Sequence, residues 1–242
     1  MINFIRKEKY GFYDLVELTK VLRSENGCPW DREQTHKSIR MNFIEETFEA
    51  CEAIDNENTE LLLEELGDVL AQVVFHAELE SEIGSFDIDD VADGVCKKFI
   101  LRHPHVFGDV TAETSAAVLK NWDDIKRKEK SQKTHFSAMD SVARSLPSLM
   151  RAEKLQSKAK KAGFPQKSLS ELSESVKEEL ALGENMNIGN VLLDVVRMAR
   201  ILGVNPEQEL DSRNEKFLAE FKKLEEEDGE LSELLLRYSD RL

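Results

Sequence analysis

The chain has 242 residues, which is enough for one large domain or for two domains of roughly 100 residues each. Its formal net charge is −15, and this excess of negative charge disfavours binding to the phosphate backbone of DNA or RNA. A triphosphate can still bind if a divalent cation stands between carboxylates and phosphates. Only 11 glycines and 5 prolines are present, and this scarcity of turn residues favours long helices over short strands. We therefore expect an all-α protein.

The cysteines and the apolar segments indicate the cellular compartment. Cys28, Cys51 and Cys96 lie far apart without C-x-x-C spacing, so neither a disulfide framework nor a thiolate metal site is indicated. Residues 1–11 are charged and lack the apolar segment of a signal peptide, and no stretch approaches the roughly 18 apolar residues of a membrane span. The sequence predicts a cytoplasmic protein that does not bind membranes.

The periodicity of apolar residues predicts five helices in the first half. In the first helix, Leu15, Leu18 and Leu22 form an apolar stripe that stops at a turn over residues 26–29. The next two helices are joined by a polar break at residues 56–58 and should form an antiparallel hairpin. The five predicted ranges are 12–23, 38–56, 59–83, 87–101 and 111–130.

A segment with the composition of a linker separates the two halves. Residues 132–146 mix Ser, Thr, Lys and small residues without sustained periodicity, so we place the domain boundary there. The predicted organisation is two tandem helical-bundle domains, residues 1–131 and 147–242, which resemble a degenerate repeat. Helices of the second half are predicted over 147–162, 168–182, 189–203, 206–227 and 231–238.

Two pairs of acidic residues should face each other across the predicted hairpin. Glu46 and Glu49 lie on its first helix, Glu65 and Asp68 on its second, and the three-residue spacing puts each pair on one helix face. Both pairs lie about nine or ten residues from the turn, roughly 15 Å along each helix, so they meet at the same height. Facing carboxylates repel one another unless they are protonated or bridged by cations. Hard divalent ions meet that need, Mg²⁺ first and Mn²⁺ second.

The alternative is an ordinary solvated helix face, which is common in a chain with 48 acidic residues. Two details favour a site. Gly67 lies inside the second helix, where glycine costs about 1 kcal/mol relative to alanine, so we expect a ligand or another helix to approach it closely. The acids also interrupt an apolar stripe that includes Phe48 and Leu66, which indicates that the site borders the core. A di-iron centre is disfavoured because the Glu-x-x-His spacing of such sites is missing.

Five motifs together closely resemble the two-domain MazG proteins, and the similarity covers nearly the whole chain. They are Asn26-Gly27-Cys28-Pro29-Trp30-Asp31, Glu45-Glu46-x-x-Glu49, Glu65-Leu66-Gly67-Asp68, Arg102-His103-Pro104-His105-Val106-Phe107 and Leu146-Pro147-x-x-x-Arg151-Ala152. The resemblance implies bundles of the all-α NTP pyrophosphohydrolase type that usually dimerise. It also implies Mg²⁺-dependent hydrolysis of NTPs or dNTPs, including non-standard ones, to the monophosphate and pyrophosphate, as nucleotide-pool housekeeping.

The resemblance further assigns roles to individual residues. Metal ligands in this assignment are Glu46, Glu49, Glu65 and Asp68. Catalytic residues are Glu45, Glu46 and Glu49, with Glu45 orienting water or supporting the ligands. A magnesium ion held there would bridge the carboxylates to phosphate oxygens and position water for attack at the α-phosphorus.

Four more residues match substrate-binding positions of the family. They are Lys98, Arg102, Trp122 and Lys126. Lys98 and Arg102 lie one helical turn apart, which suits contact with a triphosphate. Each of the four has a structural alternative, since lysines often face solvent and tryptophan often lies in a core or an interface. His103 and His105 are expected to be structural, in a turn that ends a helix, and Trp30 is expected to pack against its loop.

The second half departs from the family pattern. Leu182 stands where the family has the last Glu, while Asn187 and Asn190 replace the second acidic pair. Glu179 and Asn187 are only eight residues apart, compared with 19 for Glu46 and Glu65, so the hairpin is about three turns shorter. Glu220 also replaces a basic residue of the pattern. We interpret residues 147–242 as a degenerate domain kept for dimerisation, packing or substrate cover.

Three functions of different classes remain open at this point. The leading one is an NTP pyrophosphohydrolase that works through its N-terminal half. The second is a catalytically weak or inactive regulatory protein that binds Mg²⁺ and a nucleotide without turnover. The third is a helical interaction protein, which Mg²⁺ plus nucleotide would not stabilise against heat. Whatever the function, a long amphipathic hairpin needs another subunit to cover its remaining apolar face. The sequence therefore predicts at least a homodimer.

Overall fold

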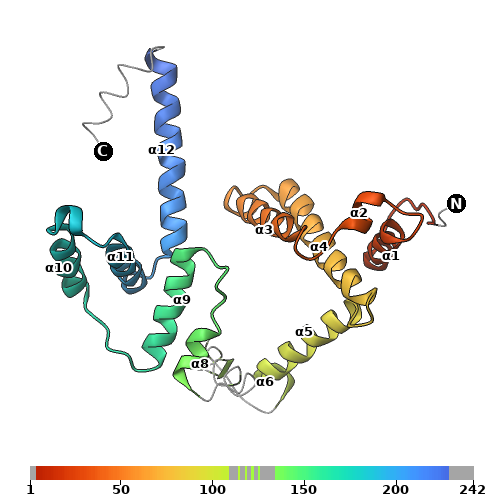
Figure 1. Cartoon of the computed structure of the whole chain (residues 1–242), viewed down its shortest axis with the longest axis horizontal. Helices are drawn as coiled ribbons and strands as arrows, with labels where there is room; N and C mark the ends of the chain where they lie inside the picture. The colour runs from red at the N-terminus through yellow and green to blue at the C-terminus, as the bar shows by residue number, and fades with distance from the viewer. Residues whose placement is uncertain are drawn as a thin grey trace. The chain divides into compact units, whose positions relative to one another are not determined.

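The computed structural model describes residues 4–108 and 134–228 and, between them, residues 114, 118, 121, 122 and 125. Within these residues every regular element is a helix and no strand occurs, which confirms the predicted all-α class (Figure 1). The chain divides into two compact units, residues 1–125 and 126–242. None of the helices described is both long enough and apolar enough to span a membrane.

The helices of the first unit follow the predicted ranges closely. They are α1 (Phe12–Arg23), α2 (Pro29–Glu33), α3 (Arg40–Asp55), α4 (Thr59–Ser81), α5 (Ile88–Arg102) and α6 (Pro104–Phe107). The sequence predicted turns in place of α2 and α6. Both are short helices that begin at a proline, a residue that suits the first helical position because it has no N–H to leave unpaired. The predicted helix over 111–130 falls almost entirely outside the described residues.

The hairpin of α3 and α4 is the framework of this unit (Figure 1). Small buried residues of α3, Ala50 and Ala53, allow α4 to approach closely, and α1 packs on α4, where Val16 is buried. The turn between the helices is set by two residues. Glu57 adopts a left-handed conformation with φ of 52°, which ends α3, and the Asn58 side chain accepts a hydrogen bond from the backbone N–H of Leu61, which begins α4.

The second unit is built from shorter helices. They are α8 (His135–Asp140), α9 (Ser148–Lys161), α10 (Leu169–Leu180), the 3₁₀ turn η1 (Gly183–Asn185), α11 (Ile188–Leu202) and α12 (Pro206–Asp228). Their contacts centre on α9, α10 and α11, where Leu172 and Val196 are fully buried. The segment 231–238, predicted as a further helix, lies outside the described residues.

Helix α8 forms inside the segment whose composition predicted a linker. The Thr134 side chain accepts a hydrogen bond from the backbone N–H of Ser137, and the helix packs against α9. Ser and Thr are frequent in linkers but they are also the residues that cap helices, so composition alone hid a short capped helix.

Candidate metal centre

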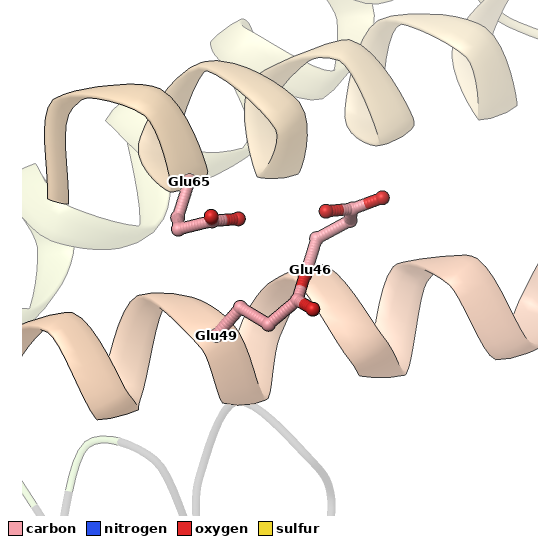
Figure 2. A group of neighbouring side chains, drawn as sticks. All are labelled: Glu46, Glu49 and Glu65. Carbon is pink, nitrogen blue, oxygen red and sulfur yellow. The ribbon is translucent and has the colours of Figure 1, made fainter. Parts of the chain in front are cut away.

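Three predicted ligands come together between the helices of the hairpin. Glu46 and Glu49 rise from α3 and Glu65 comes from α4, and their carboxylates lie between the two helices (Figure 2). One carboxylate oxygen from each residue lies within 4.8 Å of the corresponding oxygens of the other two. In the described part of the chain, no other set of His, Cys, Asp or Glu side chains has this spacing.

The three carboxylates differ in their exposure to water. Glu49 is exposed, Glu46 is half-buried, and only 8% of Glu65 is accessible. The Oε2 atom of Glu65 is buried and has no hydrogen-bond partner among the described residues. A buried carboxylate oxygen without a partner loses its hydration and gains nothing in return, so this position calls for a cation.

The pKa shifts of the carboxylates also indicate a cation site. Burial raises the pKa of Glu46, and the charges of Asp68 and Glu49 raise it further. Burial also raises the pKa of Glu65, again reinforced by Glu49 and Asp68. All of these influences disfavour the charged carboxylates. The donor set consists of oxygen atoms only, which fits a hard divalent cation such as Mg²⁺ or Mn²⁺ and gives no preference for a soft metal.

The remaining predicted members of the centre lie at its edge. Asp68 is exposed on α4, one turn after Glu65, and its carboxylate is not one of the three that lie within 4.8 Å. Its charge nevertheless acts on both Glu46 and Glu65. Glu45 is exposed on α3, beside the group but not in it.

Gly67 is more open than the sequence predicted. A Cβ atom built there would meet no atom within 4 Å, and the residue is exposed. The sequence predicted either a ligand or another helix close to this glycine. The prediction of another helix is wrong for the described part of the chain. Phe48 and Leu66 are also exposed, so the apolar stripe beside the acids is not core in a single copy.

The predicted substrate residues lie on another part of the unit. Arg102, at the end of α5, is only 7% exposed, and its guanidinium carbon lies 5.7 Å from the centre of the Trp122 ring. Lys98 is half-buried one turn earlier on α5. Lys126 falls outside the described residues. The structure thus brings Arg102 and Trp122 together.

The histidines after α5 have structural contacts, as expected. The His103 ring lies 4.8 Å from the Trp122 ring, edge to face, and its Nδ1 is 2.6 Å from the carbonyl oxygen of Phe99. The rings of His103 and His105 are 5.6 Å apart. These contacts fix the turn from α5 into α6 and place His103 against Trp122.

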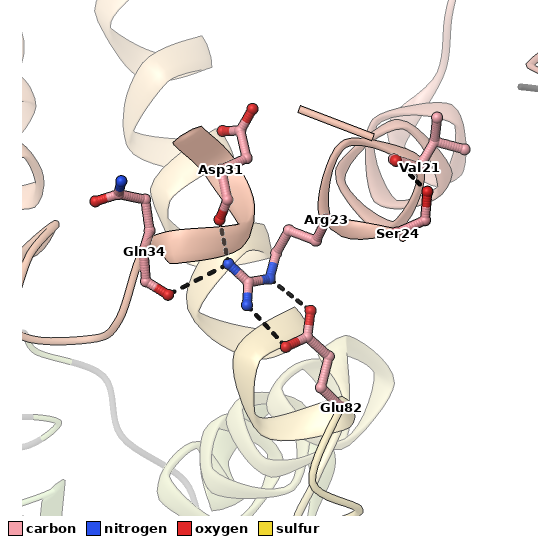
Figure 3. A network of polar contacts seen from close by, with 6 residues as sticks. All are labelled: Val21, Arg23, Ser24, Asp31, Gln34 and Glu82. Carbon is pink, nitrogen blue, oxygen red and sulfur yellow. Dashed lines mark hydrogen bonds and ion pairs between the residues drawn. The ribbon is translucent and has the colours of Figure 1, made fainter. Parts of the chain in front are cut away.

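A polar clamp that sequence reasoning missed holds the loop motif in place. Arg23 binds the carboxylate of Glu82 with two nitrogens, and Nη2 lies 2.8 Å from Oε2 (Figure 3). Its Nη1 donates to the carbonyl oxygens of Asp31 and of Gln34, the latter at 3.3 Å. The clamp joins the end of α1, the segment around α2 and the end of α4. No local pattern could reveal it, since Arg23 and Glu82 are 59 residues apart.

The loop motif itself is shaped by Gly27. A Cβ there would lie 2.2 Å from the carbonyl oxygen of Leu22, so only glycine fits the turn. Trp30 is 60% exposed, and the expectation that it packs against its loop is therefore wrong for a single copy. A second unpredicted contact lies nearby, where His36 Nδ1 is 2.7 Å from His76 Nδ1 and His36 Nε2 is 2.8 Å from Glu80.

The second unit has no comparable centre among its described residues. The chain reverses through η1, and Glu179 contacts the two asparagines beside that turn. One oxygen accepts from the backbone N–H of Asn187 at 2.6 Å and the other from the side chain of Asn190 at 3.1 Å. These hydrogen bonds lower the pKa of Glu179, with the bond from Asn187 as the largest cause. Glu179 therefore binds the start of α11, whose N-cap residue is Asn187. Glu220 forms an exposed ion pair with Arg213 at 3.5 Å.

Comparison with known proteins identifies the family. A family model described as the MazG nucleotide pyrophosphohydrolase domain matches residues 34–107. The chain is 42% identical over 216 residues to a nucleoside triphosphate pyrophosphohydrolase of Escherichia coli, which covers 83% of this chain and 81% of that protein. It is 41% identical over 223 residues to the nucleoside triphosphate pyrophosphohydrolase/pyrophosphatase MazG of Thermotoga maritima, which covers 89% of this chain and 86% of that protein. This chain belongs to the MazG family.

The MazG match lies on the part of the chain that carries the carboxylates. Residues 34–107 span α3 to α6 and include Glu46, Glu49 and Glu65 as well as Lys98 and Arg102. A Bacillus subtilis protein, YabN, is 41% identical over 260 residues, and the match covers 98% of this chain but 52% of YabN. Membership confirms the predicted resemblance and the predicted enzyme class, a pyrophosphohydrolase acting on phosphoric anhydrides.

Proposed function

We propose that the protein is a Mg²⁺-dependent hydrolase that converts nucleoside triphosphates, both NTPs and dNTPs and including non-standard ones, to the monophosphate and pyrophosphate. The observation that carries this proposal is the group of three carboxylates within 4.8 Å, one of which has a buried oxygen without a partner. Relatives named nucleoside triphosphate pyrophosphohydrolase supply the substrate class. The role in nucleotide-pool housekeeping is proposed on the same basis.

Each acidic residue has a role in this proposal. Glu46, Glu49 and Glu65 would hold Mg²⁺, and Asp68 would complete the set from the next turn of α4. When bound, Mg²⁺ supplies charge neutralisation between carboxylates and phosphates and lowers the pKa of water. Glu45, exposed beside the group, would accept a hydrogen bond from the attacking water and orient it toward the α-phosphorus.

We further propose that the working form is a homodimer. Glu65 lies 16 residues before the end of α4, about 24 Å along the helix, and α5 leaves from that end (Figure 1). Lys98 and Arg102 of the same copy are therefore remote from its carboxylates. The hairpin also exposes large apolar side chains next to the acids, including Phe48, Leu63 and Leu66. A second copy that covers this face would bring its own basic residues toward a bound triphosphate.

The first test measures pyrophosphate release from a panel of NTPs and dNTPs with Mg²⁺. We expect the full chain to be active and Glu49→Gln to lose nearly all activity, because the amide cannot replace a charged ligand. Glu60→Gln, an exposed change on α4 outside the carboxylate group, should retain it. Survival of activity in residues 1–131 would show that the second half is dispensable. Folded protein that binds Mg²⁺ and nucleotide without product would favour the regulatory alternative.

The dimer is tested by light scattering and by mixing variants. Glu49→Gln and Lys98→Ala should each be inactive alone. Mixed in equal amounts and allowed to exchange subunits, they should recover about one quarter of the wild-type activity, because half of the dimers then contain one intact site of two. A monomer at micromolar concentration would contradict the dimer, and a dimer without recovery would mean that each site uses the basic residues of its own chain.

A further inference from the structure

A cavity of about 350 Å³ in the second unit is lined by cationic side chains and by no carboxylate. It lies between α9, the loop that follows α9, and α11, with the first turns of α10 at its base. Its polar lining consists of Gln156, Lys160, Gln166, Lys167, Arg197 and Arg200. In a chain whose net charge is −15, four cations around one cavity reverse the overall balance and mark a place where an anion is attracted.

The two guanidinium groups are held in fixed positions. Arg197 donates to Asp194 at 2.7 Å through Nη1 and to Gln156 at 3.2 Å through Nε. Arg200 donates through Nη1 to the carbonyl oxygen of Glu153 at 3.0 Å and to the Glu153 carboxylate. Within the described residues, Nη2 of neither arginine makes a hydrogen bond. Arginines fixed in this way can bind an oxyanion without the entropic cost of ordering them first.

The two lysines supply the uncompensated charge. Lys160 forms no ion pair within the described residues, and Lys167 donates only to the hydroxyl of Ser175, at 3.1 Å. Asp194 and Glu153 balance the two arginines, and Glu171 at the start of α10 acts on Lys167, so the positive charge of the two lysines is only partly offset. The remaining positive charge attracts a phosphate group, which carries nearly two negative charges at neutral pH.

The remaining wall is apolar. Phe164, at the rim, is 60% exposed although its backbone is tied to α9 by a hydrogen bond to Ala159 at 3.0 Å. Leu172 closes the base and Pro165 and Ile201 lie beside it. An exposed aromatic ring beside cationic side chains can stack against a nucleotide base while the cations bind the phosphate.

We propose that this cavity binds a small phosphate-bearing anion, either a nucleotide or inorganic pyrophosphate, independently of the carboxylates of the first unit. The site needs no divalent cation, because its own side chains carry the positive charge. It thereby gives the second unit, which has lost the acidic hairpin, a binding role of its own.

The test is isothermal titration calorimetry of the full chain with pyrophosphate and with AMP. The buffer contains EDTA, which removes divalent cations and so prevents cation-dependent binding at the carboxylates. We expect wild-type protein to bind at least one of the two, and Lys160→Gln/Lys167→Gln to raise its Kd at least about tenfold. The control Lys177→Gln/Lys216→Gln removes the same charge from exposed positions outside the cavity and should change the Kd less than about twofold.

Two results would overturn the proposal. The first is no binding of either anion by wild-type protein at millimolar concentration. The second is an equal loss in both double variants, because general charge attraction would then explain the binding. Phe164→Ala distinguishes the two ligands. If the variant binds AMP more weakly than wild type but binds pyrophosphate equally well, the cavity is a nucleotide site. If the variant binds both anions as wild type does, the cavity is a site for free phosphates. Melting curves of each variant check that it is folded.

Discussion

Replacing Glu65 by Gln should abolish pyrophosphate release and at the same time make the metal-free protein more stable to heat. Glu65 is the most buried carboxylate of the group, and its Oε2 has no partner among the described residues. Burial together with the charges of Glu49 and Asp68 raises its pKa, so its negative charge opposes folding when no cation is bound. A neutral amide removes that repulsion but is a poor ligand for Mg²⁺.

The measurement combines activity with melting temperature in EDTA and in Mg²⁺. Wild-type protein should melt at a higher temperature with Mg²⁺, because the ion binds only the folded state. Glu65→Gln should melt above wild type in EDTA, gain little from Mg²⁺ and lose more than about 100-fold in activity. Glu60→Gln makes the same change on the same helix, at an exposed position outside the group, and should behave like wild type. A Glu65→Gln protein that is less stable in EDTA would mean that this carboxylate is already compensated without metal.

Replacing Arg23 by Ala should destabilise the first unit by about 2 kcal/mol, because it removes charge-assisted hydrogen bonds of a buried guanidinium although Glu82 itself is partly exposed. The Arg23 side chain is only 6% exposed. Its loss leaves Glu82 and the carbonyl oxygens of Asp31 and Gln34 without their shared donor (Figure 3). It also removes the packing of the guanidinium over the ring of Phe75, 5.1 Å from the ring centre.

Denaturant unfolding of the full chain, followed by a probe in the first unit, measures this effect. Lys97→Ala is the matched control, since its ion pair with Asp93 is exposed to solvent and should contribute little to stability. The stability loss of Arg23→Lys should lie between those of Arg23→Ala and Lys97→Ala. An ammonium group cannot bind a carboxylate with two nitrogens and also reach both carbonyl oxygens. Equal losses for Arg23→Ala and Lys97→Ala would show that the clamp contributes little to stability.

The sequence by itself determined the helices and the position of the acids along them. Residues 12–23 were predicted and found as α1, and the two hairpin helices deviate from their predicted ends by at most two residues. Periodicity and capping are local properties, so one chain segment contains the information needed. The same is true of the shortened second hairpin, where the eight residues from Glu179 to Asn187 predicted the early chain reversal that the structure shows between α10 and α11.

Only the tertiary structure decided how the side chains are used. It buried Glu65 but left Asp68 and Gly67 exposed on the same helix, which spacing alone cannot distinguish. It also joined Arg23 to Glu82 and gathered cations of α9 and α11 around one cavity. The physical reason is that burial and polar contacts depend on which distant segments pack together and in which rotamers, whereas helix formation depends mainly on neighbouring residues.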